Sequence, residues 1–294
     1  MSVRSAPVIF GEVLFDCFPD GSQVLGGAPF NVAWHCQAFG LSPLLVSRVG
    51  RDARGEQVLS AMRDWGMNTS AVQQDEEHAT GIVDVQIVDG EPHYNIVQDS
   101  AWDFIAADAL PDIDADGLLY HGSLALRSAD SAAALQQLKQ SGREMFVDIN
   151  LREPWWQVDR VRDMIRGVDC VKLNELELQA LAGDVPERSA AMQQLMQDRQ
   201  VTRLIVTLGE QGVLAAVAGE MPQQAQPQPA TRVVDTVGAG DAFSSVMLLA
   251  RYRGWSLADS LQRAQQFASA IVGIRGATIS NSDFYQPFIS TWGL

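Results

Sequence analysis

Cysteine is scarce in this sequence, where only Cys17, Cys36 and Cys170 occur among 294 residues. They are widely spaced and odd in number, which argues against a disulfide framework or a metal-binding cluster. Long apolar stretches are also missing: none approaches the roughly 18 to 20 residues that a membrane span needs. The first ten residues lack the pattern of a cleaved signal peptide. We therefore expect a cytoplasmic protein with reduced thiols and no membrane partner.

Positive charge is in short supply as well. The sequence has 21 Lys and Arg residues against 36 Asp and Glu residues, which gives a formal net charge of −15. This excess of negative charge disfavours nucleic acid as a partner. A phosphate-rich ligand would have to be held by local groups. Backbone N–H groups at a helix N-terminus, one or two arginines and a metal ion can serve in this way.

Short apolar runs alternate with amphipathic helical patterns over most of the chain, without an internal repeat or a linker between domains. The runs predict buried strands at residues 44–49, 118–120, 145–149, 170–173 and 204–208. The helical patterns cover residues 31–39, 56–65, 128–139, 175–181, 190–198, 239–253 and 257–274. This alternation predicts an α/β fold in which residues 1–294 form one domain. Its core would be a doubly wound, mainly parallel sheet flanked by helices.

Two segments depart from this alternation. Residues 9–25 turn at Pro19-Asp20-Gly21, and residues 81–98 alternate around Asp89-Gly90, a strong hairpin signal. Both predict half-exposed antiparallel strands that would form a small lid beside the main sheet. Exposed strand edges invite pairing, so a homodimer is also an expectation. A third segment, residues 223–229, is rich in Gln and Pro and predicts a surface loop.

The most informative motif is the run Asp-Thr-Val-Gly-Ala-Gly-Asp-Ala-Phe at residues 235–243, between a strand-like segment at 232–234 and a helical pattern. Gly238 and Gly240 permit a tight turn and a close approach to a ligand. The N–H groups at the start of the following helix attract an anion. Asp241 would lie beside a bound phosphoryl group, where it could take a proton from an attacking hydroxyl.

Physics alone leaves a second interpretation of this turn open, in which Asp241 is only an acidic residue in the first turn of a helix. Two common nucleotide-binding loops are missing from the sequence: no Gly-x4-Gly-Lys-Ser/Thr occurs, and no Gly-x-Gly-x-x-Gly follows the first strand.

Residues 235–243 resemble the C-terminal signature of the PfkB, or ribokinase-like, carbohydrate kinases, and four further segments match this family in the expected order. The resemblance implies a ribokinase-like fold, ATP and Mg²⁺ as cofactors, and a small sugar as the acceptor. It implies that Asp241 is the catalytic base. The N–H groups of Gly238, Ala239 and Gly240 would then stabilise the charge of the transferred group.

Two of the matching segments belong to the sugar side of the family's site. The first contains Gly11-Glu12, Asp16 and the run Gly-Gly-Ala-Pro-Phe-Asn at residues 26–31. By the resemblance, the sugar-binding residues in it are Asp16, Gly26, Gly27 and Asn31. The second, Asp-Ile-Asn-Leu-Arg at residues 148–152, is similar to the fructokinase pattern Asp-x-Asn-x-Arg. It makes Arg152 a partner of the sugar or phosphoryl group, although many fructokinases have Pro in place of Ile149.

The other two segments belong to the nucleotide side. Asn174-Glu175-Leu176-Glu177 resembles the family's Asn-x-x-Glu motif, which implies that Asn174 serves the nucleotide and that Glu177 serves Mg²⁺ through water. Residues 207–212 resemble a nucleotide loop, and in it the resemblance assigns nucleotide binding to Thr207, Gly209 and Gly212. Gly276-Ala277 and Ser280 resemble the family's terminal loop, and by this resemblance Asp235 and Ser280 would shape a K⁺ site.

Fructose is the first expectation for the acceptor, on the evidence of the motifs at 26–31 and 148–152. A 2-keto-3-deoxygluconate or related sugar-acid kinase is the alternative, and it would need an extra basic group in the site. A nucleoside acceptor fits less well. A non-catalytic sugar-binding regulatory protein would be marked by loss of Asp241 or of a glycine in its turn, and all of them are present.

Overall fold

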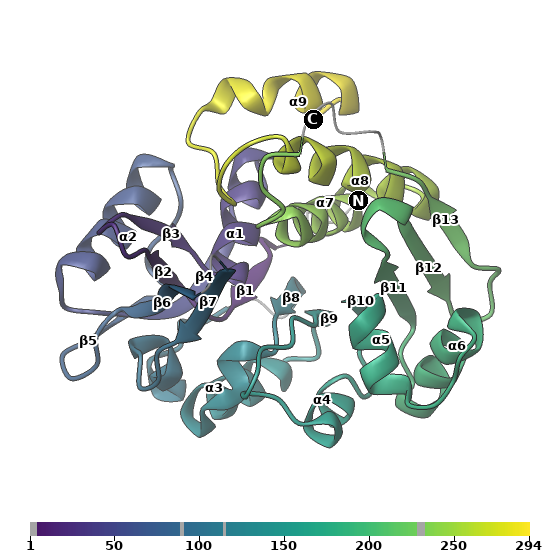
Figure 1. The fold of residues 1–294 in the computed structure, drawn as a ribbon, viewed down its shortest axis with the longest axis horizontal. Coiled ribbons are helices and arrows are strands. Elements are labelled where there is room, and N and C mark those ends of the chain that lie inside the picture. Colours follow the sequence, from purple (N-terminus) through teal and green to yellow (C-terminus); the bar gives the residue numbers. More distant parts are fainter. Residues whose placement is uncertain (1–4, 89–90, 114–115, 228–232) are drawn as a thin grey trace.

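A large twisted sheet forms the centre of the molecule (Figure 1). The structure is a computed structural model that describes residues 5–88, 91–113, 116–227 and 233–294. The strand order in the large sheet is β13-β12-β11-β10-β9-β8-β1-β4-β5. The strands are β1 (Val8–Phe10), β4 (Leu44–Gly50), β5 (Val72–Asp75), β8 (Leu118–His121), β9 (Glu144–Asp148), β10 (Cys170–Asn174), β11 (Arg203–Thr207), β12 (Val213–Val217) and β13 (Gln223–Ala225). In this sheet order, the seven strands from β11 through β5 run parallel to one another. Strands β12 and β13 are antiparallel to their neighbours.

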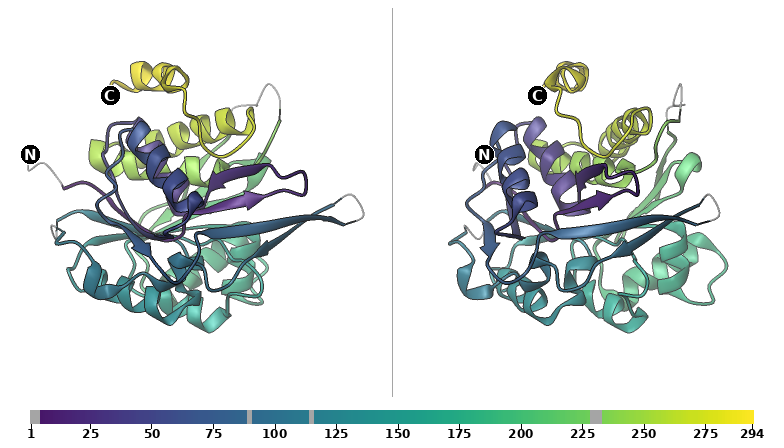
Figure 2. Two further views of the ribbon diagram at one scale, coloured as in Figure 1. Left: turned by 90° about the vertical axis from the view of Figure 1, so that its left-hand side faces the viewer. Right: turned by 60° about the vertical axis from the view of Figure 1, so that its left-hand side comes forward.

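Helices cover both faces of this sheet (Figure 2). One face carries α1 (Ala28–Ala38), α2 (Ala53–Asp64), α7 (Ala239–Arg253) and α8 (Leu257–Val272), with α9 (Gln286–Trp292) packed outside them. The other face carries α3 (Ala129–Lys139), α4 (Val158–Met164), α5 (Glu175–Ala182) and α6 (Arg188–Arg199). Because strand side chains alternate between faces, Ile9 of β1 packs toward α1 and α7, while Val8 and Phe10 pack toward α3. This two-sided burial explains the uninterrupted apolar runs and confirms the doubly wound α/β prediction.

A smaller sheet stands off the edge of the large one, in the strand order β3-β2-β6-β7 (Figure 2). Its strands are β2 (Leu14–Cys17), β3 (Gln23–Gly26), β6 (Gly81–Val88) and β7 (Glu91–Ile96). The prediction of a small sheet from these two segments is confirmed. The expected range 9–25 began too early, however, because Ile9 and Phe10 belong to β1 of the large sheet. The two hairpins are antiparallel as expected, but they are joined by a parallel pairing of β2 with β6.

Four further expectations have different outcomes. The predicted surface loop at 223–229 is wrong at its start, because Gln223–Ala225 form β13 against β12. The strand-like segment at 232–234 is also wrong where it is described, since Val233 and Val234 lie in no strand. The turn at Asp89-Gly90 and residues 228–229 lie outside the described residues. A homodimer through the edges β3 and β7 stays a prediction.

Within the described ranges, none of the helices combines the length and apolar character required to cross a bilayer.

A buried ion pair fixes the chain where it leaves the small sheet. Arg127 donates from Nε and Nη2 to the two carboxylate oxygens of Asp103, each at 2.7 Å, and from Nη2 to the carbonyl of Val97 at 2.6 Å. Its guanidinium also lies over the rings of Trp102 and Trp155. Both charged side chains are only 5% exposed. The exit of β7 is thereby attached to the large sheet.

Replacing Arg127 by Met should lower the free energy of unfolding by about 3–5 kcal/mol, because it leaves the Asp103 carboxylate buried without its cation. Urea denaturation of the purified variant measures the loss. The control is Arg63→Met, which breaks an ion pair with Glu56 whose side chains are 55% and 71% exposed. An exposed pair contributes about 0–1 kcal/mol. Equal losses in the two variants would contradict the assigned role of Arg127.

Candidate active site

Residues of the matching motifs lie at the edge of the large sheet where its parallel strands end. Glu12 follows β1, Asp148 ends β9, Asn174 ends β10 and Thr207 ends β11. Because these strands are parallel, their carboxyl ends lie along one edge, which is where open α/β sheets bind their ligands. Helix α7 begins at this edge too, and the strand register therefore brings together motifs that are far apart in sequence.

The Gly-rich turn begins α7 as predicted. Gly238 is the N-cap residue, with a φ of 80° that disfavours any side chain. A Cβ atom placed on Gly238 would lie 2.6 Å from the Cα atom of Ala277, so the turn also leaves no space for one. The first N–H groups of a helix lack intrahelical partners, and here Ala239 N–H makes only a long contact of 3.4 Å to the Thr236 carbonyl. This geometry suits an anion.

Asp241 lies in the first turn of α7 and contacts the predicted sugar side of the site. Its Oδ2 accepts a hydrogen bond of 2.8 Å from Nδ2 of Asn31 on α1. Withdrawal from water raises the pKa of Asp241 to about 7, against the opposing effect of the Asn31 hydrogen bond. The charge of Asp148 raises this pKa further, while Lys172 and Arg152 lower it. A carboxyl group with a pKa near neutrality is well matched to proton abstraction.

A second buried carboxyl group, Glu12, was not assigned a role from the sequence. It is 3% exposed, and its Oε2 has no hydrogen-bond partner within the described chain. Burial raises the pKa of Glu12 to about 7, the charge of Asp241 raises it too, and Arg152 and Arg127 lower it. The sequence signal for this residue was its place in the Gly11-Glu12 pair, directly after an apolar strand.

The remaining sugar-side residues surround these two carboxyl groups. Asp16 is on β2 of the small sheet, where burial raises its pKa and Arg152 lowers it. Gly26 ends β3, and Gly27 is the N-cap residue of α1 with a φ of 110°. A Cβ atom on Gly27 would lie 2.7 Å from the carbonyl oxygen of Glu12. Arg152 is exposed, and its charge acts on Glu12, Asp16 and Asp241 alike.

The Asn-x-x-Glu motif forms a capping box at the start of α5. Asn174 Oδ1 accepts the N–H of Glu177 at 2.9 Å, and Glu177 Oε2 accepts the N–H of Asn174 at 2.8 Å. The other carboxylate oxygen of Glu177 accepts the N–H of Leu151 at 3.0 Å. Burial raises the pKa of Glu177 despite these hydrogen bonds. The motif thus has a structural role, and its metal role stays a prediction.

The predicted nucleotide loop follows β11. Thr207 donates to the carbonyl of Leu173 at 3.4 Å, and Gly209, with a φ of 57°, begins a 3₁₀ turn. Gly212 has a φ of 93°, and a Cβ atom there would collide with the carbonyl oxygen of Ala225 in β13. Packing against β13 is therefore a sufficient reason for glycine at 212. Nucleotide binding by this loop stays a prediction.

Asp235 connects the turn before α7 to the loop after α8. Its Oδ1 accepts the N–H of Val237 at 3.0 Å, and its Oδ2 accepts the N–H of Gly276 at 3.2 Å. Ser280 is an exposed residue of that second loop. The two oxygen-bearing residues thus lie on adjoining segments, and their K⁺ role stays a prediction. Among the described residues, no group of three or more His, Cys, Asp or Glu side chains could hold a metal ion.

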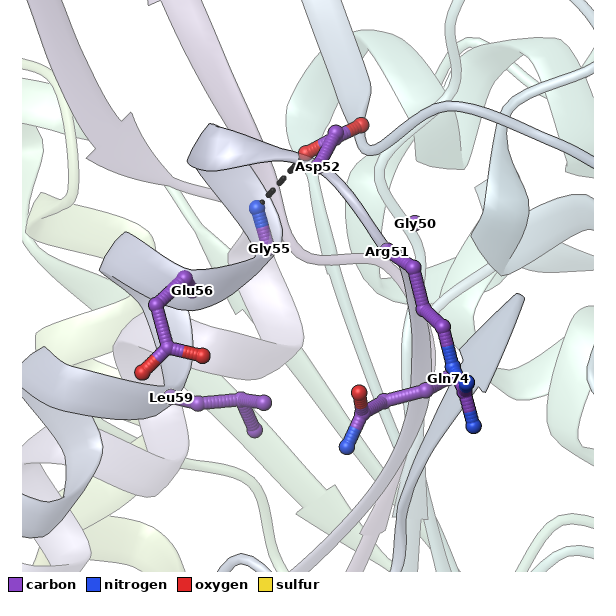
Figure 3. A pocket seen from close by; sticks show the side chains of 7 residues that line it. All are labelled: Gly50, Arg51, Asp52, Gly55, Glu56, Leu59 and Gln74. Atoms are coloured by element: carbon purple, nitrogen blue, oxygen red, sulfur yellow. Dashed lines mark hydrogen bonds between the residues drawn. The ribbon is translucent and has the colours of Figure 1, made fainter. Parts of the chain in front are cut away.

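A cavity of about 310 Å³ at the carboxyl end of β4 is separate from these residues. None of the predicted site residues lines it (Figure 3). Two of its polar groups have structural partners: the Asp52 carboxylate accepts the N–H of Gly55 at 2.8 Å as the N-cap of α2, and Arg51 pairs with Glu76 at 2.9 Å.

The comparisons with known proteins agree with this arrangement. Residues 17–283 match the model of the pfkB family carbohydrate kinases. The chain belongs to this family. It is 32% identical over 256 residues to a fructokinase from Klebsiella pneumoniae, with 82% of each chain covered. The PfkB resemblance is confirmed, and the protein is an enzyme that phosphorylates a sugar hydroxyl.

Solved structures confirm the ribokinase-like fold. A fructokinase from Xylella fastidiosa with bound ATP superposes with a TM-score of 0.85 at 22% identity, covering 99% of this chain and 100% of that one. A fructokinase from Vibrio cholerae O395, in a form with fructose, ADP and calcium ion bound, has a TM-score of 0.81 at 26% identity. That match covers 97% of this chain and 99% of the other.

For this PfkB kinase we expect kcat/KM for the sugar to rise as the pH approaches about 7 and then to level off, because only ionised Asp241 can accept a proton and the pKa of about 7 is that of the free enzyme. Below that pH the rate should change about tenfold per pH unit. Asp241→Asn should lower kcat about a thousandfold on the plateau above pH 7, within the range for loss of a general base, and should remove the pH dependence below it. Initial rates between pH 5.5 and 9 measure both effects. Glu12→Gln is the control for the second titrating carboxyl group. The fall in rate below pH 7 is the acid limb of the pH profile. If this acid limb vanished in Glu12→Gln, Glu12 rather than Asp241 would be the group that titrates.

Gly238→Ala should lower kcat by at least a hundredfold, because the new methyl group meets Ala277 and displaces the anion-binding turn. The matched control is Gly254→Ala at the other end of α7. Gly254 also has a positive φ, of 65°, but no atom lies within 4 Å of its added Cβ. It should cost about 1–2 kcal/mol of stability for the backbone conformation, with kcat unchanged. Similar kinetics for the two variants would show that the turn tolerates a side chain.

Proposed function

We propose that this PfkB kinase is a fructokinase, which transfers the γ-phosphate of ATP to a primary hydroxyl group of fructose. The observation that carries the proposal is the 32% identity to the Klebsiella pneumoniae fructokinase over 82% of both chains. The fructose and ADP in the Vibrio cholerae fructokinase support the same pair of substrates. A cytoplasmic location, where ATP is abundant, fits this activity.

The charge of the site supports a neutral sugar over a sugar acid. Glu12, Asp16 and Asp241 bring three carboxyl groups to the sugar side, and the charge of Arg152 acts on all of them. Arg127 is already paired with Asp103. Carboxylates accept hydrogen bonds from sugar hydroxyls but repel a second carboxylate. The 2-keto-3-deoxygluconate alternative would need a basic group beyond Arg152, so fructose is the better fit.

In the proposed reaction, Asp241 takes the proton of the attacking hydroxyl group while Asn31 keeps its carboxylate oriented. The hydroxyl oxygen attacks the γ-phosphorus in line, and the bond to the β-phosphate oxygen breaks, which releases ADP. N–H groups of Gly238, Ala239 and Gly240 stabilise the charge on the transferred group. Arg152 would balance the remaining negative charge near the sugar.

The oxygen atoms of Glu177 suit a water-mediated Mg²⁺ site. Each already accepts one backbone N–H and retains lone-pair capacity for a metal-bound water, and Mg²⁺ prefers few protein ligands. When bound, Mg²⁺ would neutralise part of the negative charge of the phosphates. Asp235 and Ser280 would hold K⁺ behind the anion-binding turn, and Asn174, Thr207 and Gly209 would line the nucleotide.

The small sheet would close over the sugar as a lid. Its strand β2 carries Asp16, so closure would bring a hydroxyl-binding carboxylate to the substrate and exclude water from the phosphoryl group.

The direct test is acceptor-dependent ADP release with Mg-ATP and K⁺. The panel contains fructose, other ketoses, aldoses, 2-keto-3-deoxygluconate and nucleosides. We expect kcat/KM for fructose to exceed that for every other acceptor by at least tenfold, which corresponds to about 1.4 kcal/mol of preferred transition-state binding. Asp241→Asn supplies the control for contaminating kinases. A higher kcat/KM for the sugar acid or a nucleoside would replace fructose as the assigned acceptor.

A further inference from the structure

A buried lysine lies beneath the first turn of α7. Lys172 is the third residue of β10 and is 7% exposed. Its Nζ lies 2.9 Å and 3.0 Å from the two carboxylate oxygens of Asp148, at the end of β9. The same Nζ donates to the carbonyl oxygen of Gly240 at 3.3 Å. The ammonium group therefore joins two neighbouring strands to the anion-binding turn.

Asp148 is fully engaged by the protein itself. Besides Lys172, its Oδ2 accepts hydrogen bonds from the hydroxyl of Ser244 at 2.6 Å and from that of Tyr120 at 3.1 Å. Ser244 is on α7, one turn after Gly240, and Tyr120 is on β8. Asp148 thus begins the Asp-x-Asn-x-Arg motif but is saturated by internal donors. It acts as an internal anchor for α7.

The fit between Lys172 and the turn is close. A Cβ atom on Gly240 would lie 3.0 Å from the lysine Nζ, so glycine at 240 makes room for the ammonium group. Since the Gly240 carbonyl is in the first helical turn, its position fixes that of the neighbouring N–H groups. A displacement of Nζ would therefore be transmitted to the residues expected to contact phosphate.

The position of the Lys172 ammonium group is energetically unfavourable unless a counter-charge lies nearby. Burial disfavours the charged lysine, and a cation at the N-terminal end of a helix opposes the helix dipole. The Asp148 carboxylate, with the charges of Asp241 and Glu177, more than offsets the effect of burial, and the pKa of Lys172 is raised. The ammonium also opposes the effect of Asp148 on the pKa of Asp241. The ionisable groups acting on Lys172 and Asp241 are Glu12 after β1, Tyr120 on β8, Asp148 on β9, Arg152 after β9 and Glu177 on α5.

We propose that Lys172 is a positioning residue for phosphoryl transfer: it fastens the first turn of α7 to the sheet through Gly240, and it balances the charge of Asp148 next to Asp241. It acts through these groups and touches no reacting atom. The inference rests on the phosphoryl transfer of the proposed function, but not on which sugar accepts the group.

The test compares Lys172→Met with Lys172→Arg and with the double variant Lys172→Met/Asp148→Asn. Lys172→Met should lower kcat about a hundredfold, with KM for the sugar within about threefold of wild type. Its acid limb should move to higher pH, because an unbalanced Asp148 carboxylate raises the pKa of Asp241. Lys172→Arg keeps the charge and should restore the limb. The double variant removes both charges, so its acid limb should return to a pH near that of the wild type. Its kcat should stay low, because no group donates to the Gly240 carbonyl.

The control is Arg251→Met at the opposite end of α7, where Arg251 Nε donates to Glu144 at 2.6 Å in a half-buried pair. It should lower the Tm but leave kcat and the acid limb unchanged. Wild-type kcat and an unmoved limb in folded Lys172→Met would overturn the proposal, as would identical kinetic changes in Arg251→Met. If Lys172→Met does not fold, the double variant decides, and wild-type kcat there refutes the role.

The acceptor in all these assays is whichever sugar the wild-type enzyme phosphorylates best. A wild-type enzyme that prefers another sugar would refute fructose as the substrate and leave the test of Lys172 intact.

Discussion

The proposed site has to bind negatively charged phosphate next to several carboxyl groups of the protein. The rest of its structure depends on how the repulsion between these charges is limited. The chain carries a formal net charge of −15, and three carboxyl groups meet on the sugar side. Withdrawal from water raises the pKa values of Glu12 and Asp241 to about 7, so these groups are partly neutral at physiological pH. In the proposed reaction the phosphoryl group is left to backbone N–H groups, which carry no net charge and need no counter-ion. This division would explain how an acidic protein binds an acidic substrate.

Much of the fold was predictable because its signals are local. Residues 235–243 place two glycines directly before an apolar helical pattern, and α7 begins at Ala239 as this spacing predicts. Five strands of the large sheet, β4, β8, β9, β10 and β11, were likewise visible as short apolar runs, whereas β5 and β12 were not predicted. The boundary of the small sheet was not predictable, because apolar alternation continues from β1 into β2 through Gly11 and Val13. The parallel pairing of β2 with β6 joins residues 67 positions apart, such as Leu14 and Gly81, and no local pattern records it.

The site residues divide in the same way. Asp241, Asn31 and Arg152 were proposed as site residues from motifs. Glu12 was quoted within a motif but given no role of its own, and Lys172 was overlooked because it is a single charged residue inside an apolar strand. A usable signal did exist for Lys172, since a charge inside a buried strand needs a counter-charge nearby. Asn174 and Gly212 show the converse, because each has a sufficient structural reason for its identity, in the capping box and in packing against β13. A motif match alone does not separate such roles from ligand binding.

The placement of Asp16 has a consequence for how such an enzyme diverges. The proposed base and anion-binding turn are both on α7 and would move together, whereas Asp16 is on β2 of a separate sheet. Substitutions in the small sheet can therefore alter which acceptor is held without changing the distance between the base and the phosphoryl site. A lineage that carries this fold can change its sugar while it keeps its chemistry, and the small sheet is where such changes would accumulate.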